Sequence, residues 1–294
     1  MDTWAVVALA VIVGSIAISL WQRISYSIVA SAACIIIFAL TIATDSYASM
    51  VFAPHDLVDP DYAYTVLTSM YAHAQPNPVS NYGLWHLLFN IFGLIFLGIM
   101  FEQRVGQKPF IVIYLLSGLF GTLAFAAYYW SDSTISVLGA SGAISGVLGA
   151  YARLFPKERM SMMLMFIPLP PLPIWQIVGL FVALQFFFVT GSGIAWQAHL
   201  GGLVAGIILA PIAVRMFQSR RAGPIKRVVS VPALRKLATT PKLRSMLERI
   251  ESESVPEVRS AWISEFLSRA KCPVCGAPIT AAGDGLRCSR GHLI

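Results

Sequence analysis

The chain has 294 residues, of which 57% are hydrophobic and only 12% are charged. That charged share is about half of what a soluble globular domain carries. The composition therefore excludes a protein built only of soluble domains. The net charge of +7 is unevenly spread, because 14 of the 21 Lys and Arg residues follow residue 216. We therefore expect an apolar membrane part followed by a basic tail.

Seven apolar stretches are long enough to cross a bilayer, since a helix needs about 20 apolar residues to span the hydrocarbon layer. They run over residues 4–21, 25–43, 84–101, 110–130, 137–154, 174–190 and 195–216. The first stretch also has the length of a signal peptide, but no Lys or Arg precedes it. The apolar, proline-rich segment 160–175 is expected to be an interfacial loop.

Positive charges fall in alternate connections between these stretches, as Arg23, Arg104, Arg153 and Arg215 illustrate. The other connections are 44–83, 131–136 and 191–194; none of them holds Lys or Arg, and the first two carry aspartates. Cytoplasmic connections are the ones enriched in Lys and Arg. The pattern predicts that the N-terminus and the long 44–83 loop lie outside and that the C-terminal tail is cytoplasmic.

In this orientation the third, fifth and seventh stretches all descend from the outer face. Their first turns carry His86 with Asn90, Ser141, and His199, so these side chains are expected at one depth. Taken singly, a membrane serine is most simply a packing residue, and a membrane histidine faces a partner or a polar cavity. Small residues recur at four-residue intervals around Ser141 and His199, and such seams let two helices touch. The combination favours a shared site over packing alone.

A serine hydroxyl becomes a nucleophile when a base within about 3 Å takes its proton, and histidine suits that role at neutral pH. Ser141 and His199 are the candidate pair. The spans hold no acid near either residue, so we expect a dyad and not a triad. His86 and Asn90 lie one helical turn apart and can both donate to a developing oxyanion. The set indicates acyl transfer to Ser141 followed by hydrolysis.

At these residues the chain resembles the rhomboid family of intramembrane serine proteases. The resemblance covers about 25–216 and rests on GASG around Ser141, HLLFN from His86 to Asn90, AHLGG around His199, and the FEQRVG turn. It implies a six-helix core with Ser141 as nucleophile and His199 as base. It also implies an oxyanion site formed by His86, Asn90 and the backbone amides of Ala140 and Ser141. No cofactor is expected for catalysis.

The resemblance further implies that the substrates are membrane proteins, cleaved in a transmembrane helix near the outer face. Loop 44–83 is implied to dip into the outer leaflet beside the site. Two positions depart from the family pattern. A histidine of the family is replaced by Asn81, with His73 as the nearest equivalent, and Ser145 stands where many members have an aromatic residue.

The C-terminal end carries a second candidate site. Cys272 and Cys275 form a CxxC knuckle, and Cys288 and His292 follow. Three thiolates and one imidazole are a ligand set for tetrahedral Zn²⁺ that leaves no position for water. We therefore expect a structural zinc ribbon over 269–294, used for binding a cytoplasmic protein partner or for regulation. A nucleic-acid partner is not expected.

The predicted fold class is an all-α polytopic membrane protein, integral to a prokaryotic cell membrane. The expected parts are an additional N-terminal helix (1–24), a six-helix membrane domain (25–216), a basic, partly helical cytoplasmic linker (217–268) and the ribbon (269–294). Basic residues after the last span suit anionic lipid headgroups or simply set the topology. They are Arg220, Arg221, Lys226 and Arg227.

The predicted function is intramembrane proteolysis by a serine endopeptidase. One alternative is a catalytically idle rhomboid-like factor that binds membrane proteins or takes part in their quality control. A transporter is disfavoured, because charged or broken-helix sites at mid-membrane are absent from the sequence pattern.

Overall fold

The computed structural model describes residues 2–76, 81–132, 134–164, 167–187, 194–218, 231–253, 256–282 and 285–293. The chain divides into two compact units, Met1–Phe217 and Gln218–Ile294. Helices dominate the first unit, which we call the membrane unit, and the predicted class of an all-α polytopic membrane protein is confirmed.

Five described helices are long and apolar enough to cross a bilayer. They are α1 (Thr3–Gln22), α2 (Tyr26–Thr44), the continuous helix Tyr82–Val105, α6 (Gln107–Tyr128) and α9 (Trp196–Gln218). The third of these comprises α4 (Tyr82–Gly93), the π-helical turn η3 (Leu94–Gly98) and α5 (Ile99–Val105). The other two predicted spans correspond to α7 (Ser141–Leu154) and α8 (Ile174–Phe187), each of 14 residues. Within the described residues these two are therefore shorter than expected.

Tertiary contacts explain the late start of α7. Phe52 and Val137 exchange backbone hydrogen bonds of 3.1 and 2.8 Å, and Gly139 N–H donates to the Ser69 carbonyl at 2.8 Å. These bonds hold the chain before Ser141 out of helical conformation. The expected helix over 137–140 is wrong for that reason, and the first helical residue is Ser141 itself.

Prolines determine where α8 begins, and residues 188–190 of the predicted span lie outside the described residues. The segment expected to be a loop forms an antiparallel hairpin of β1 (Arg159–Leu164) and β2 (Ile167–Pro173). Proline cannot donate a backbone hydrogen bond and is tolerated in an edge strand better than inside a helix. The helix begins only after the last of these prolines, at Ile174.

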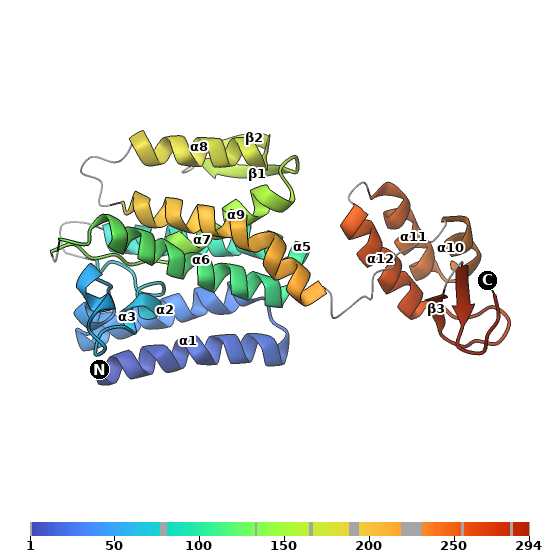
Figure 1. The fold of residues 1–294 in the computed structure, drawn as a ribbon, viewed down its shortest axis with the longest axis horizontal. Coiled ribbons are helices and arrows are strands. Elements are labelled where there is room, and N and C mark those ends of the chain that lie inside the picture. Colours follow the sequence, from blue (N-terminus) through green and yellow to red (C-terminus); the bar gives the residue numbers. More distant parts are fainter. Residues whose placement is uncertain are drawn as a thin grey trace. The chain divides into compact units, whose positions relative to one another are not determined.

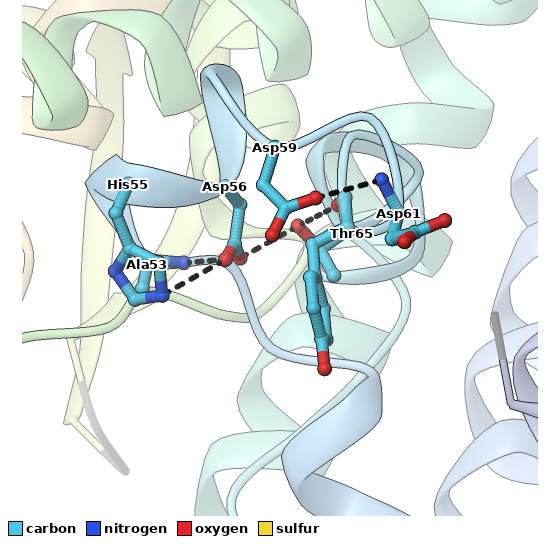
Figure 2. Close-up of polar contacts among 7 residues, drawn as sticks. Ala53, His55, Asp56, Asp59, Asp61 and Thr65 are labelled. Carbon is cyan, nitrogen blue, oxygen red and sulfur yellow. Dashed lines mark hydrogen bonds and ion pairs between the residues drawn. The ribbon is translucent and has the colours of Figure 1, made fainter.

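The connection between α2 and α4, called the outer connection after its predicted side of the membrane, is folded by its own polar contacts. It contains η1 (Tyr47–Ser49), η2 (Pro54–Leu57) and α3 (Thr65–Thr68). Asp56, which is 4% exposed, accepts hydrogen bonds of 2.9 Å from Ala53 N–H and from the Thr65 hydroxyl. Figure 2 shows the Asp56 carboxylate between these two groups, with the His55 ring beside it. This fixed loop supplies Phe52 and Ser69, which position the start of α7.

The FEQRVG turn is anchored by a buried carboxylate. Glu102 is 6% exposed and accepts from the hydroxyls of Ser25 and Ser27 at 2.6 and 3.0 Å. It also accepts from the backbone N–H groups of Tyr26 and Ser27 at 2.8 and 3.1 Å. These amides begin α2 and have no partner within the helix, so a carboxylate there stabilises the helix start. The contact ties α5 to α2.

Glycines bring α9 against α6 and α7 in the middle of the membrane unit. A Cβ atom at Gly202 would overlap the carbonyl oxygen of Gly142, and one at Gly206 would overlap that of Gly146. On α6, Gly121 faces the Ala198 carbonyl in the same way. Figure 1 shows these three helices side by side, with α1 at one edge of the unit and α8 with its hairpin at the opposite edge.

The second unit, the C-terminal unit, has a hydrophobic core of its own. It comprises α10 (Val231–Leu237), α11 (Pro241–Ser252), α12 (Pro256–Arg269) and the hairpin β3 (Ile279–Ala282) with β4 (Gly285–Cys288). Ile250 and Phe266 from the helices share this core with Cys272 and Cys288. Helices predicted as part of a linker thus pack with the Cys/His segment as one unit. The basic residues Arg220, Arg221, Lys226 and Arg227 lie outside the described residues.

Candidate active site

Ser141 is the first residue of α7, directly after a turn that only glycine fits. Gly139 has φ +106°, a conformation that L-residues with a side chain rarely adopt. A Cβ atom there would also lie 2.8 Å from the imidazole of His86. The first backbone N–H groups of α7 have no partner within the helix. The turn therefore presents the Ser141 hydroxyl together with free amides.

His199 lies in the first turn of α9 and faces Ser141. The His199 Nε2 atom is 2.7 Å from the Ser141 Oγ atom, a hydrogen-bond distance. The two residues are 58 positions apart in the chain, and the glycine contacts between α7 and α9 bring them together. A proton can pass directly between these atoms.

A third side chain, which the sequence analysis did not single out, completes this row. The Gln185 Oε1 atom of α8 is 2.8 Å from His199 Nδ1. A carbonyl oxygen only accepts, so Nδ1 carries the hydrogen and Nε2 is left to accept from Ser141. The one available signal was a polar residue in an uncharged apolar stretch, which usually has a partner.

His86 and Asn90 of α4 lie on the other side of Ser141. His86 Nδ1 accepts a hydrogen bond from the Ala74 N–H at 3.5 Å, so its Nε2 carries the hydrogen and faces the turn at Gly139. The Asn90 amide donates to the His86 carbonyl at 2.8 Å and keeps its second N–H available. Both side chains can therefore act as donors near Ser141.

These residues line one cavity of about 390 Å³, together with residues of the outer connection, α7, α8 and α9. Ser141, His199, His86 and Asn90 all face it. Ala140 is fully buried and does not line it among the residues described, so only its backbone amide can contribute. The described lining holds no carboxylate. The cavity is thus a neutral, mixed polar and apolar hollow with hydrogen-bond donors on one wall.

His73 supports His86 from the outer connection. Its ring centroid lies 5.2 Å from that of His86, and its Nδ1–H donates to the Tyr71 carbonyl at 3.1 Å. Burial, and secondarily the nearby His86, lowers the pKa of His73 to about 3. The side chain is therefore neutral at physiological pH and packs as an uncharged ring.

The serine that departs from the family pattern has a local role in the helix. The Ser145 hydroxyl donates to the Ser141 carbonyl at 2.7 Å. An aromatic contact comes from α8 instead, where the Phe181 ring centroid lies 6.1 Å from that of His199. The imidazole is thus bounded by α8 on the side away from Ser141.

The four predicted metal ligands meet in the C-terminal unit. The ligand atoms of Cys272, Cys275, Cys288 and His292 all lie within 4.8 Å of one another. Tetrahedral Zn²⁺ with bonds of about 2.3 Å to sulfur and about 2.0 Å to nitrogen needs S···S separations of about 3.8 Å and S···N separations of about 3.5 Å. The Cys275–Cys288 sulfur distance is 3.7 Å, and His292 Nδ1 lies 3.3, 3.5 and 3.8 Å from the three sulfurs.

One member of the donor set, Cys288, already favours the thiolate form. Burial raises the pKa of Cys288, but backbone N–H groups of His292 and Arg290 outweigh it and lower the pKa to about 6. A thiolate at neutral pH is the form that binds a metal. The residues fit a divalent ion of the size and preference of zinc.

Comparison with known proteins gives the family. The model of the rhomboid domain matches residues 60–216, which is more than half of the chain and includes Ser141, His199, His86 and Asn90. The chain belongs to the rhomboid family. Its rhomboid domain thus holds every residue of the Ser141 cavity that the motifs had pointed to.

Individual relatives match only part of the chain, at modest sequence identity. The chain is 28% identical to Rhomboid protein 1, mitochondrial, of Saccharomyces cerevisiae over 52% of its own length and 43% of that protein. It is 30% identical to Rhomboid protease AarA of Providencia stuartii over 42% of its own length and 50% of that protein. It is also 35% identical to Inactive RHOMBOID-like protein 8 of Arabidopsis thaliana, over 32% and 24% of the two chains. The chain thus spans half or less of the length of these relatives.

The turn before Ser141 allows a test with a matched control. Gly106 has φ +90° and open space around it, whereas Gly139 has φ +106° and the His86 ring beside it. Gly106→Ala should therefore cost only backbone strain, about 1–2 kcal/mol. Gly139→Ala should cost about 1–3 kcal/mol more, because the new methyl group displaces His86. Thermal unfolding of both variants in detergent measures the difference, and equal melting temperatures would contradict the close approach of His86.

Proposed function

We propose that this rhomboid is an intramembrane serine endopeptidase that cleaves transmembrane segments of membrane proteins near the outer face. The observation that carries the proposal is the 2.7 Å contact between His199 Nε2 and Ser141 Oγ at the wall of a cavity. Relatives named as rhomboid proteases support it.

In the proposed reaction, His199 Nε2 takes the Ser141 proton while Oγ attacks the carbonyl carbon of the scissile peptide bond. The carbonyl oxygen becomes an oxyanion, and the donors available to it are His86 Nε2–H, the free Asn90 N–H and the backbone amides of Ala140 and Ser141. His199 then gives the proton to the leaving amine, which departs and leaves an acyl-enzyme. Water attacks the ester with His199 again as base, and Ser141 is restored.

The substrate class follows from the surroundings of the dyad. Apolar helices enclose the cavity, and α8 leaves Trp175, Phe186 and Phe187 exposed to the lipid, at 57%, 62% and 82%. A substrate that reaches Ser141 laterally must itself be apolar, as a transmembrane helix is. Membrane lipids are the other expected contacts.

Charge asymmetry supports the proposed orientation. The N-terminus and the outer connection lie outside and the C-terminal unit lies in the cytoplasm of a prokaryotic cell. In that compartment cysteines stay reduced and free to bind metal. The helix over 1–24 adds to a six-helix domain over 25–216 in this arrangement.

A catalytically idle binding or quality-control factor is the second candidate, because one relative is named as inactive. Such a protein needs the cavity to bind its partner, but it does not need a serine hydroxyl that is hydrogen-bonded to a histidine. The hydrogen bond between Ser141 and His199 therefore favours the enzyme.

For the C-terminal unit we propose a structural Zn²⁺ held by Cys272, Cys275, Cys288 and His292, with 269–294 as a zinc ribbon after the helical 217–268. The ribbon has few core residues of its own, so the metal supplies stability. Two knuckle glycines, Gly276 and Gly291, with φ +69° and +89°, allow the tight turns that gather the ligands. A protein partner in the cytoplasm is the expected use of this surface, and nucleic acid is not.

The protease proposal predicts that Ser141→Ala and His199→Ala each abolish cleavage of a test transmembrane substrate in liposomes. The matched controls are Ser31→Ala in α2 and His55→Ala in the outer connection, which remove the same groups away from the cavity. A fluorophosphonate probe should label wild-type Ser141 and both controls, and neither site variant. Cleavage that persists without Ser141 would contradict its role as nucleophile. A folded wild-type protein that neither cleaves the substrate nor takes the label would favour the idle factor.

The zinc proposal predicts one zinc per chain in purified protein, measured by elemental mass spectrometry. Cys288→Ala should lose the metal and melt the C-terminal unit, because the ligands hold its hairpin to the helices. Cys34→Ala, a buried cysteine of the membrane unit, should keep it. Metal-free wild-type protein with a folded C-terminal unit would refute the structural role.

A further inference from the structure

Helix α8 packs one face against the other helices of the membrane unit, and that face carries a single polar residue. Ile174 and Ile177 are buried, Phe181 is half-buried, and Gln185 continues the row at helical spacing. Only 8% of Gln185 is exposed. The second glutamine of the helix, Gln176, lies on the exposed side. The two residues of one type in one helix therefore have opposite environments.

A buried amide in an apolar helix is costly unless it is hydrogen-bonded. Leucine or valine would fill the same face at no such cost, as elsewhere in α8. The contact that offsets the cost for Gln185 is its Oε1 atom at 2.8 Å from His199 Nδ1. The amide is thus directed at the one group that the proposed reaction requires to act as a base.

The bond decides which nitrogen of His199 carries the proton. With Nδ1–H donated to Gln185, Nε2 has a free lone pair that faces the Ser141 hydroxyl. In the other tautomer Nε2–H would point at Ser141 and could not take its proton. The bond also fixes the rotation of the ring, as a second hydrogen-bond partner does for the histidine of a catalytic triad.

We propose that Gln185 is a positioning residue, which holds His199 in the tautomer and orientation that accept the Ser141 proton. The expected dyad is then extended to a hydrogen-bonded row of Ser141, His199 and Gln185, in which the proton moves only between Ser141 and His199. This inference rests on the proposed protease function. Gln185 itself is not among the residues that line the cavity in the described chain, so it acts through His199 and not on the substrate.

An uncharged amide suits this place. The other titratable groups on the described cavity wall are His86, Tyr47 and Tyr82, and none is a carboxylate. A buried carboxylate in place of Gln185 would carry its full desolvation cost whenever His199 is neutral. The amide dipole orients the ring without that cost, but it stabilises the imidazolium less than a carboxylate does. Its loss should therefore reduce the rate less than the roughly 10⁴-fold known for the acid of a triad.

The bond also joins two helices. Gln185 belongs to α8 and His199 to α9, so the bond exists only while α8 is seated against the rest of the unit. A competent base therefore requires α8 in this position at the moment of proton transfer.

The test compares Gln185→Leu with Gln176→Leu, which makes the same chemical change in the same helix on its exposed side. Cleavage of a test transmembrane substrate in liposomes gives kcat and KM, and fluorophosphonate labelling gives the reactivity of Ser141. Gln185→Leu should lower kcat and the labelling rate together by roughly 10- to 100-fold with little change in KM. Gln176→Leu should match wild type.

The variant Gln185→Glu separates loss of the hydrogen bond from a general disturbance of the fold, because glutamate keeps the acceptor oxygen. It should recover labelling to within several-fold of wild type. It should also move the acidic limb of the pH–rate profile to higher pH, since a carboxylate stabilises the protonated imidazole and the base is then lost at a higher pH. A side chain that only fills space would produce neither the recovery nor the shift.

Wild-type rates in Gln185→Leu, or a loss in Gln185→Leu that Gln185→Glu repeats with no shift of the profile, would overturn the positioning role while leaving the protease assignment intact. Failure of the proposed function has a different result, since wild-type protein would then show no labelling at Ser141, and the role of Gln185 would fall with it.

Discussion

The contact of two helix backbones is the constraint on which the structure depends. Gly202 and Gly206 of α9 lie so close to the carbonyl oxygens of Gly142 and Gly146 that any side chain would overlap them. This close approach of the two backbones brings His199 within hydrogen-bond distance of Ser141. Without hydrophobic force between helices in lipid, such close packing is a main source of helix association. The same contact thus stabilises the unit and assembles its candidate site.

Side chains from two further helices, α4 and α8, hold the candidate site on either side of the contact between α7 and α9. On one wall, α4 directs His86 and Asn90 at the turn before Ser141, with His73 packed behind. On the other, α8 brings Phe181 and Gln185 to the imidazole. A catalytic group held by packing and by hydrogen bonds keeps its geometry through a reaction. Ser145 offers no aromatic ring to His199, and Phe181 of α8 supplies one instead. The ring that packs on His199 therefore comes from a different helix than in the family pattern.

The membrane helices and their main contacts could be predicted from the sequence. Long apolar runs indicate the helices, and small residues four positions apart indicate where two helices touch. Those two signals indicated the pairing of Ser141 with His199. The late start of α7 could not be predicted, since it depends on bonds from Phe52 and Ser69 in a loop far away in the chain. Gln185 was missed because one amide in an apolar run resembles a tolerated exception, and only the fold shows what it faces. The β1–β2 hairpin was missed because prolines exclude a helix without indicating strand pairing.

The backbone contact between α7 and α9 is tested by the fluorophosphonate labelling rate of Ser141 in the series Gly202, Gly202→Ala and Gly202→Val. Gly179→Ala in α8 is the control, since its Cβ atom would meet nothing within 4 Å. We expect the labelling rate to fall stepwise along this series, by roughly 100-fold at valine, because a displacement of about 1 Å at a reacting pair costs that much. Labelling that stays at the wild-type rate in folded Gly202→Val would contradict it.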